Sequence, residues 1–182
     1  MNALRSSRAL AVGTGLRIVA CPVIMGLVLS HDYVPAAIVF LVAAATDWFD
    51  GRLARRWGVT TKLGSFLDTT ADKLLVTGTL IALVAVDRAS PWVALVMIGR
   101  EMTVLGLRAA VAASGQHLEA SMLGKWKATL QFVALALAIL RPDVIIAGAY
   151  LDQWVLVIAA VVTAWSGVDY FLRFSSSLRS GT

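Results

Sequence analysis

Four aspartates interrupt two apolar stretches in the first half of the chain, where residues 47–73 read DWFDGRLARRWGVTTKLGSFLDTTADK. They come in two pairs along the sequence, Asp47 with Asp50 and Asp68 with Asp72. A charged side chain at the centre of a bilayer costs at least about 2.5–3.5 kcal/mol. If these stretches cross a membrane, then water, cations or protein partners must compensate the four charges.

The composition of the chain is that of a helical membrane protein. Of the 182 residues, 59% are apolar or aromatic and 15% are charged, and the mean hydropathy is +0.80. A soluble domain is usually about 45–50% apolar and about 25% charged, so a disordered chain, a coiled coil or an ordinary soluble enzyme fits poorly. The single cysteine, Cys21, excludes an internal disulfide framework and a cysteine-based zinc site. The net charge of +5 requires no nucleic-acid partner, because membrane proteins collect Lys and Arg on cytoplasmic loops.

Six apolar runs account for most of the chain. A membrane-spanning helix needs about 20 apolar residues, so six spans use about 120 residues and leave only short connections. We therefore expect an all-α, polytopic membrane protein with six transmembrane helices, built as one integral membrane domain over residues 1–182. The predicted spans are residues 8–29, 34–57, 62–86, 91–113, 122–140 and 153–174.

The basic residues predict how these spans are oriented. With the N-terminus in the cytoplasm, only Arg88 and Arg141 fall in the outer loops. Because Lys and Arg concentrate on the cytoplasmic side of membrane proteins, this asymmetry favours both termini in the cytoplasm. The basic residues of the inner loops and tails are then Arg5, Arg8, Arg52, Arg55, Arg56, Lys62, Lys125, Lys127, Arg173 and Arg179.

The spacing of the four aspartates predicts that they face one another. Residues three or four apart share a helix face, as Asp47 and Asp50 do, and as Asp68 and Asp72 do. A turn at residues 58–60 would fold the two helices into an antiparallel pair. Asp50 and Asp68 each lie eight residues from this turn, which is about 12 Å along a helix. All four carboxylates are therefore expected to converge between the helices, near the cytoplasmic side.

Such a cluster is typical of a site for divalent cations. Four carboxylates repel one another unless cations neutralise them or some stay protonated. Oxygen-only ligands suit hard ions such as Mg²⁺, Mn²⁺ or Ca²⁺, and two such ions would hold a phosphate-rich substrate. Small residues such as Gly51 and Gly64 would let a ligand approach the backbone, and Arg55 could bind phosphate. The alternative is that the carboxylates only pair with basic neighbours, namely Lys73, Arg52 and Arg55.

The same stretch resembles the signature of the CDP-alcohol phosphotransferases, D-x2-D-G-x2-A-R-x8-G-x3-D-x3-D. Every fixed position from Asp47 to Asp72 matches. The resemblance implies a six-helix fold in the bacterial inner membrane, usually homodimeric, with the active site on the cytoplasmic side. It also implies a phosphatidyltransferase reaction, in which a hydroxyl attacks the phosphate of a CDP-linked lipid or alcohol and CMP leaves.

The family's functional residues carry over onto the matching positions. The implied ligands of two divalent ions, Mg²⁺ or Mn²⁺, are Asp47, Asp50, Asp68 and Asp72. The resemblance makes Asp72 also the general base, a role that requires it to lie within hydrogen-bond reach of the attacking hydroxyl. The implied contacts to the cytidine diphosphate of the donor are Gly51, Arg55 and Thr61.

Two later segments of the sequence indicate which alcohol accepts the phosphatidyl group. Residues 99–108 (GREMTVLGLR) and 124–131 (GKWKATLQ) resemble segments of the bacterial phosphatidylglycerophosphate synthases within this family. They supply three cations that could bind the phosphate of sn-glycerol 3-phosphate, namely Arg108, Lys125 and Lys127. The competing interpretation of the lysines is ordinary enrichment of cytoplasmic loops in positive charge. Arg100 lies deeper and is expected to pair with Glu101 or with the aspartates.

The first span matches the family only in part. It keeps Thr14 and Arg17 of the usual pattern but has Ala11 and Gly13 near the positions of its Asn and Leu. Arg17 either serves the site or extends its side chain to the membrane surface.

Several functions remain open at this point. The favoured one is phosphatidyl transfer from CDP-diacylglycerol to glycerol 3-phosphate. The same chemistry with phosphatidylglycerol would make the chain a cardiolipin synthase, and with inositol phosphate a phosphatidylinositol phosphate synthase. A cation transporter often shows internal repeats, whereas here the clustered aspartates lie in one helical pair only. An inactive membrane scaffold would leave four costly charges without a role.

Overall fold

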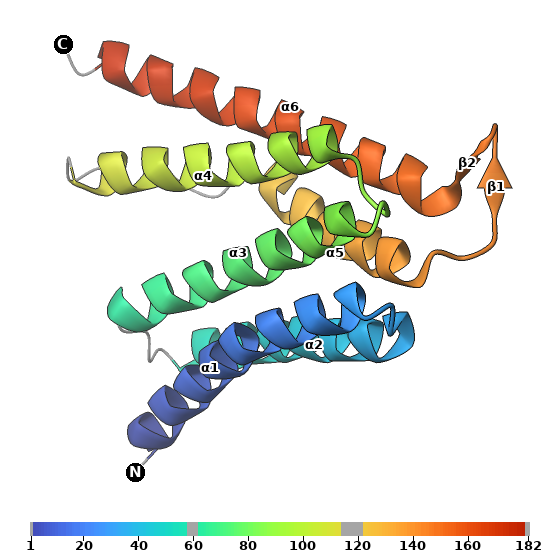
Figure 1. The fold of residues 1–182 in the computed structure, drawn as a ribbon. Helices are drawn as coiled ribbons and strands as arrows, with labels where there is room; N and C mark the ends of the chain where they lie inside the picture. The colour runs from blue at the N-terminus through green and yellow to red at the C-terminus, as the bar shows by residue number, and fades with distance from the viewer. Residues whose placement is uncertain (1, 58–61, 114–121, 181–182) are drawn as a thin grey trace. The chain divides into compact units, whose positions relative to one another are not determined.

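The computed structural model describes the backbone of residues 2–57, 62–113 and 122–180, and the side chains of residues 13–46, 67–112 and 126–172. These parts of the chain contain six helices and one small sheet, so the predicted helical architecture is confirmed (Figure 1). The elements are α1 (Asn2–Leu29), α2 (Tyr33–Trp57), α3 (Lys62–Ala85), α4 (Pro91–Ala113), α5 (Met122–Leu140), β1 (Ile145–Ile146), β2 (Ala149–Tyr150) and α6 (Leu151–Ser180).

The predicted helix boundaries agree best with those of the structure in the middle of the chain. Helices α4 and α5 begin and end at the predicted residues, and α2 and α3 differ by one residue at one end. Helices α1 and α6 are longer than the predicted runs 8–29 and 153–174. An apolar run marks the part of a helix that suits lipid, whereas the helix itself continues for as long as each residue gains its intrahelical hydrogen bond.

Two of the connections are tight because the preceding helix ends in a left-handed cap. After α1, His31 has a φ of 64°. Its amide donates to the Val28 carbonyl at 3.1 Å, and the Asp32 amide donates to the Leu27 carbonyl at 2.8 Å. This pair of bonds is the Schellman motif, which satisfies the last carbonyls of a helix. Asp87, with a φ of 55°, makes the same motif after α3.

A short β-hairpin before α6 was not predicted. Ile145 pairs with Tyr150 in antiparallel fashion, and the two residues between the strands, Ala147 and Gly148, have φ values of 50° and 84°. Positive φ at both central residues is the mark of a type I′ turn, for which Asn-Gly is the usual sequence signal. The hairpin was not predicted because its turn sequence is Ala-Gly and not the usual Asn-Gly. The Trp154 indole donates to the Ile146 carbonyl at 2.8 Å and ties the hairpin to α6.

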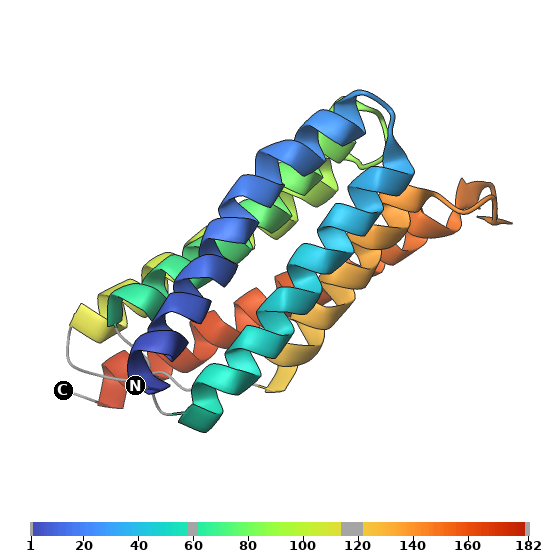
Figure 2. The same ribbon diagram turned by 90° about the horizontal axis from the view of Figure 1, so that it is seen from below.

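The first compact unit, Met1–Arg88, contains α1, α2 and α3. Helix α1 packs against both of the other helices, and α2 runs antiparallel to α1 (Figure 2). The largest fully buried apolar side chains in this unit are Ile24, Val28, Phe40, Leu75, Leu80 and Leu83.

A glycine allows α1 and α3 to approach each other closely. A Cβ atom on Gly78 of α3 would collide with the Cys21 sulfur and would lie 3.1 Å from the Met25 sulfur. Cys21 is buried, and its thiol donates to the Leu74 carbonyl at 3.3 Å. The single cysteine is therefore a small packing residue between the two helices.

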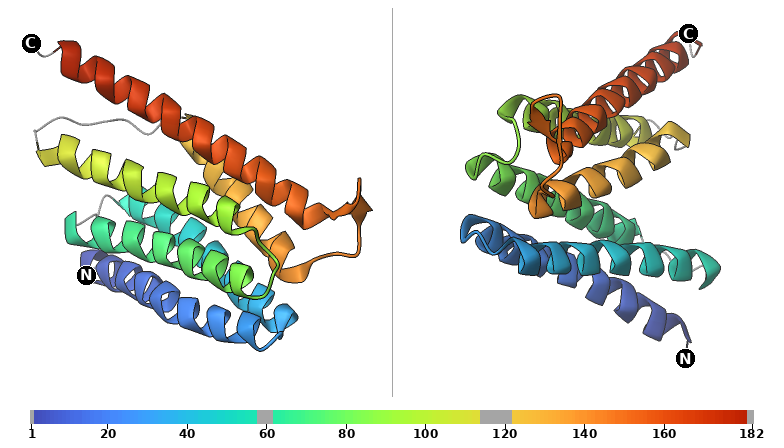
Figure 3. Two further views of the ribbon diagram at one scale, coloured as in Figure 1. Left: turned by 45° about the horizontal axis from the view of Figure 1, so that its top comes forward. Right: turned by 90° about the vertical axis from the view of Figure 1, so that its right-hand side faces the viewer.

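The second compact unit, Ala89–Thr182, contains α4, α5, the hairpin and α6. Helix α6 packs against α4 and against α5 (Figure 3). Met97, Leu135, Ile139 and Leu156 are fully buried in this unit. The Arg141 guanidinium at the end of α5 lies 3.4 Å from the carboxylate of Asp152, which is fully buried in the first turn of α6.

One segment of the described chain, Leu151–Leu172, is long and apolar enough to cross a bilayer. Shorter apolar segments occupy Gly13–Leu29, Tyr33–Thr46 and Trp126–Leu140. The helices also expose many large apolar side chains, a feature that soluble monomers avoid over large areas. Among the most exposed are Val19, Val34, Trp92, Leu95, Trp126, Val161, Trp165 and Leu172.

Candidate active site

Helix α3 carries the second pair of predicted site residues. Asp68 and Asp72 lie four residues apart on this helix and therefore on the same face, as their spacing predicted. The Asp68 side chain is 38% exposed, and the Asp72 side chain is less accessible.

Asp68 is held by an arginine from the first helix. Arg17 is only 1% exposed, and its Nη2 donates to Asp68 Oδ1 at 2.5 Å. Its Nη1 also lies 3.4 Å from the Asp68 backbone carbonyl, as a second donor. Of the two roles considered for Arg17, the structure therefore excludes extension to the membrane surface, because the guanidinium is buried against a predicted site residue. The pairing links α1 to α3 across 51 positions of sequence.

Asp72 has one oxygen that the described part of the protein leaves unsatisfied. Its Oδ2 accepts from Lys73 Nζ at 3.3 Å, which is the local pairing considered above as an alternative to cation binding. Its Oδ1 is buried and has no hydrogen-bond partner among the described atoms. Leaving a buried carboxylate oxygen without a partner is costly, so this atom is suited to a bound cation or to a transferable proton.

The first pair of predicted ligands is placed only by its backbone. Asp47, Asp50, Gly51 and Arg55 lie on the last three turns of α2, and their side chains lie outside the described residues. Thr61 lies outside the described residues altogether. Among the side chains that are described, no three His, Cys, Asp or Glu residues gather as a metal site. The convergence of all four aspartates therefore stays a prediction.

A second charged cluster lies in the other unit, around Glu101 of α4. Arg100 Nη1 lies 3.3 Å from Glu101 Oε1, and Lys127 Nζ of α5 forms an ion pair with the same oxygen. Glu101 and Lys127 are each only 3% exposed. The predicted pairing of Arg100 with Glu101 is confirmed, whereas the role of Glu101 as the partner of Lys127 was missed.

Helix α6 supplies two hydroxyl groups to the arginines of α4. Arg100 Nη2 donates to Ser166 Oγ at 2.8 Å, and Arg108 Nε donates to Tyr170 Oη at 2.9 Å. Gly167 makes room for this crossing, because a Cβ there would lie 3.0 Å from Arg100 Cγ. The signal available in the sequence was the four-residue spacing of a serine and a tyrosine within an apolar helix.

The α4–α5–α6 cluster carries more positive than negative charge. Its cations are Arg100, Arg108 and Lys127, and Glu101 is the carboxylate that contacts two of them. Even with Asp169 of α6 counted, the cations outnumber the carboxylates. Arg108 is exposed, so its guanidinium is accessible to an anionic ligand such as a phosphate. Lys125, on the first turn of α5, has a side chain outside the described residues.

Comparison with known proteins places these features in one family. The family model described as CDP-alcohol phosphatidyltransferase matches residues 11–165. The chain is 39% identical over 152 residues to a Bacillus subtilis (strain 168) protein, covering 81% of this chain and 77% of the relative. It is 44% identical to relatives from Sodalis glossinidius, over 139 residues, and Escherichia coli (strain K12), over 140 residues, with 74% of this chain and 75% of each relative covered. All three relatives are named CDP-diacylglycerol–glycerol-3-phosphate 3-phosphatidyltransferase.

Proposed function

The chain belongs to the CDP-alcohol phosphatidyltransferase family, and we propose that it transfers the phosphatidyl group of CDP-diacylglycerol to sn-glycerol 3-phosphate. The products are phosphatidylglycerophosphate and CMP, so the enzyme serves phospholipid biosynthesis. The observation that carries this proposal is the identity of 39–44% with relatives that bear the name of this activity, over about three quarters of each relative.

Asp72 is the proposed general base. The acceptor hydroxyl gives its proton to this carboxylate as its oxygen attacks the donor phosphorus that carries the diacylglycerol. A new phosphate ester bond forms between the acceptor oxygen and this phosphorus. The bond from the same phosphorus to the bridging oxygen of the diphosphate breaks, and CMP leaves with that oxygen. The buried Oδ1 of Asp72, without a hydrogen-bond partner among the described atoms, supports this role because it can take up the proton.

The proposed ligands of two divalent cations, Mg²⁺ or Mn²⁺, are Asp47, Asp50, Asp68 and Asp72. The residues fit such ions, because the donor set contains only carboxylate oxygens. Bound divalent ions supply Lewis-acid stabilisation of the phosphates. Arg17 fixes the orientation of Asp68 by holding its Oδ1, so the other carboxylate oxygen remains for a ligand.

Basic residues bind the anionic parts of both substrates in this proposal. The acceptor phosphate is bound by Arg108, Lys125 and Lys127, and Tyr170 orients the Arg108 guanidinium. Burial of Lys127 against Glu101 fixes the position of its ammonium group, but it also offsets part of its charge. Arg108 is therefore the principal phosphate ligand among the described side chains. The donor's cytidine diphosphate is contacted by Gly51, Arg55 and Thr61.

The proposed membrane arrangement is supported by the sequence pattern and the exposed apolar surface. The protein spans the bacterial inner membrane with six helices, as one catalytic domain over residues 1–182, and acts as a homodimer. Both termini and the active site lie on the cytoplasmic side. The segment Leu151–Leu172 and the exposed apolar side chains of the helices support this placement.

An acceptor panel tests the proposal. Purified protein is incubated with CDP-diacylglycerol, Mg²⁺ and one of three acceptors, and the lipid product is identified by mass spectrometry. We expect phosphatidylglycerophosphate with glycerol 3-phosphate. Cardiolipin formed from phosphatidylglycerol, or phosphatidylinositol phosphate formed from inositol phosphate, without product from glycerol 3-phosphate, would assign a different acceptor within the same chemistry. If none of the three acceptors caused release of CMP, the assignment to this group of acceptors would be overturned.

A further inference from the structure

The connection between α5 and α6 contains an uncharged segment that lies outside the predicted spans. After residues 141–143 (RPD), residues 144–150 read VIIAGAY and include the β1–β2 hairpin. Val144, Ile145 and Ile146 are 45%, 66% and 49% exposed. A connection that lies in water is normally polar, so three consecutive exposed branched apolar side chains indicate a surface that is covered in the working protein.

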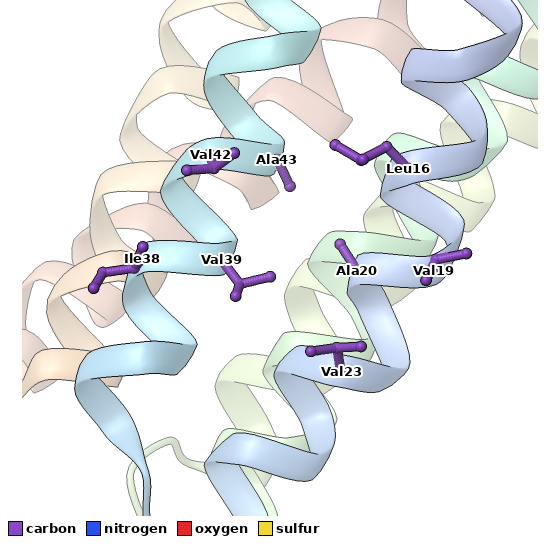
Figure 4. A pocket seen from close by; sticks show the side chains of 8 residues that line it. All are labelled: Leu16, Val19, Ala20, Val23, Ile38, Val39, Val42 and Ala43. Carbon is purple, nitrogen blue, oxygen red and sulfur yellow. The ribbon is translucent and has the colours of Figure 1, made fainter.

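This exposure differs in place from that of the helices. Between α1 and α2, for example, apolar side chains line an open groove that follows the two helices (Figure 4). Apolar side chains along a helix are expected wherever the helix crosses lipid. The hairpin instead precedes the apolar segment Leu151–Leu172 and projects from the N-terminal end of α6 (Figure 1). With α6 across the bilayer, the hairpin therefore lies at the level of the membrane surface.

Hydrogen bonds hold the hairpin against α6. The Leu151 amide donates to the Val144 carbonyl at 2.9 Å and closes the hairpin at its base. The Trp154 indole donates to the Ile146 carbonyl from one turn into the helix. The exposed side chains are thus presented in a fixed position by the helix whose apolar segment is long enough to cross a bilayer.

We propose that residues 144–150 insert into the interfacial layer of the outer leaflet, opposite the cytoplasmic side, and anchor the outer end of α6 there. This inference goes beyond the proposed function, because it rests on the proposed membrane placement and not on the reaction. The segment contains no charged side chain that would have to leave water. Tyr150 and Trp154 lie at the same level, and Tyr and Trp are enriched at membrane–water interfaces.

The backbone of the hairpin limits how deeply it enters the membrane. The sheet has two strands in the part of the chain that the structure describes, so the outer edge of each strand carries backbone groups without a sheet partner. Unsatisfied backbone groups are too costly for the hydrocarbon core. The interfacial layer offers water to these groups and apolar contact to the side chains, and it is therefore the depth that suits both.

The exposure of both faces of β1 favours lipid over a protein partner. Consecutive side chains of a strand point to opposite faces, and Ile145 and Ile146 are both exposed. A docked protein would cover one face, whereas lipid surrounds both. The hairpin is also small for a protein interface, which usually takes about 20–30 residues from each partner, because residues 144–150 supply only seven.

Quenching of a fluorescent label measures the depth of the hairpin. In a Cys21→Ala background, Ile145→Cys and Ile146→Cys are labelled in separate proteins with the fluorophore NBD, one on each face of β1. Each full chain is reconstituted in phosphatidylcholine vesicles whose lipids carry a nitroxide either near the carboxyl end or near the methyl end of the acyl chain. Iodide on both sides of the membrane serves as the quencher in water.

Both hairpin labels should behave alike. We expect blue-shifted emission, stronger quenching by the nitroxide near the carboxyl end than by the one near the methyl end, and protection from iodide. These results follow from lipid on both faces at an interfacial depth.

Two further labels in the same compact unit calibrate the measurement. Asp143→Cys, at the exposed polar residue just before the hairpin, should be quenched by iodide. Val161→Cys lies on α6, 63% exposed and about 15 Å along the helix from Leu151. This distance reaches the middle of a hydrocarbon layer about 30 Å thick, so its label should be quenched most by the nitroxide near the methyl end.

The other outcomes would each overturn the proposal. Iodide quenching of the hairpin labels as strong as that of the Asp143 label would place the hairpin in water. Protection of either hairpin label from iodide and from both lipids would show that protein covers it, and strongest quenching by the deep nitroxide would place it in the hydrocarbon core.

The Val161 label separates this proposal from the membrane placement on which it rests. If that label also escaped quenching by both lipids, the proposed span of α6 would be refuted together with the anchor. If the Val161 label were quenched as expected and the hairpin labels were not, only the anchor would be overturned. Phosphatidyl transfer is measured separately by the acceptor panel, so its failure is distinguishable from both.

Discussion

The ion pair between Arg17 and Asp68 predicts an asymmetric loss of stability. Asp68→Ala leaves a guanidinium that is 1% exposed without its carboxylate, whereas Arg17→Met leaves a carboxylate that is 38% exposed. Removing one partner of a buried ion pair costs about 3–5 kcal/mol when nothing else contacts the remaining charge. We expect a smaller loss, about 2–3 kcal/mol, for Asp68→Ala, because Arg17 keeps the backbone carbonyl of residue 68 as an acceptor. For Arg17→Met we expect about 1 kcal/mol, because solvent reaches the remaining charge and screens the lost contact.

A double-mutant cycle measures this asymmetry. The free energy of unfolding is measured in bicelles without divalent cations, so that metal binding does not contribute. The double variant should be more stable than Asp68→Ala alone, because it contains no buried charge to compensate. Equal losses in the two single variants, or a double variant whose loss is the sum of the two, would show that the difference in burial of the two side chains does not govern their contribution to stability.

Three further substitutions test the site. Asp72→Asn should lower kcat by about 10²–10⁴-fold while CDP-diacylglycerol still binds in a filtration assay, and unchanged turnover would remove Asp72 as the base. Glu101→Gln should destabilise the protein by about 1.5–3 kcal/mol in chemical unfolding, because it replaces the charged acceptor of the Lys127 ammonium group with a neutral amide oxygen. Unchanged stability would contradict the pairing. Arg108→Gln should raise the KM for glycerol 3-phosphate about ten- to a hundredfold and leave the donor KM unchanged, since a hydrogen bond to a charged group is worth about 1.5–3 kcal/mol. Its control is Arg88→Gln, at a residue whose guanidinium lies over the Tyr33 ring, and an equal effect there would argue against a specific phosphate site.

The helices were largely predictable because each run of apolar residues indicates a segment that suits lipid. The bounds of α4 and α5 follow directly from the polar residues on either side of them. The ends of α1 and α6 were less predictable, since a helix can continue into polar sequence beyond the lipid-compatible run. The type I′ hairpin was hidden because Ala147 adopts a positive φ that alanine rarely takes.

The site was predictable where spacing within one helix decides it. The shared face of Asp68 and Asp72 follows from their separation of four residues. The partners of Arg17 and Lys127 come from other helices, 51 and 26 positions away, and no local pattern identifies them. Their burial shows that each of these two charges is compensated by a carboxylate of another helix, which hydropathy alone does not reveal.

The proposed mechanism requires aspartates from α2 and α3 to bind divalent cations together. Titration of purified protein with Mn²⁺, with the bound ions counted by electron paramagnetic resonance, measures this binding. Two magnetically coupled ions should bind per chain, and the coupling should be lost in Asp47→Asn and in Asp68→Asn. Mn²⁺ binding that is absent, or that persists unchanged in both variants, would contradict it.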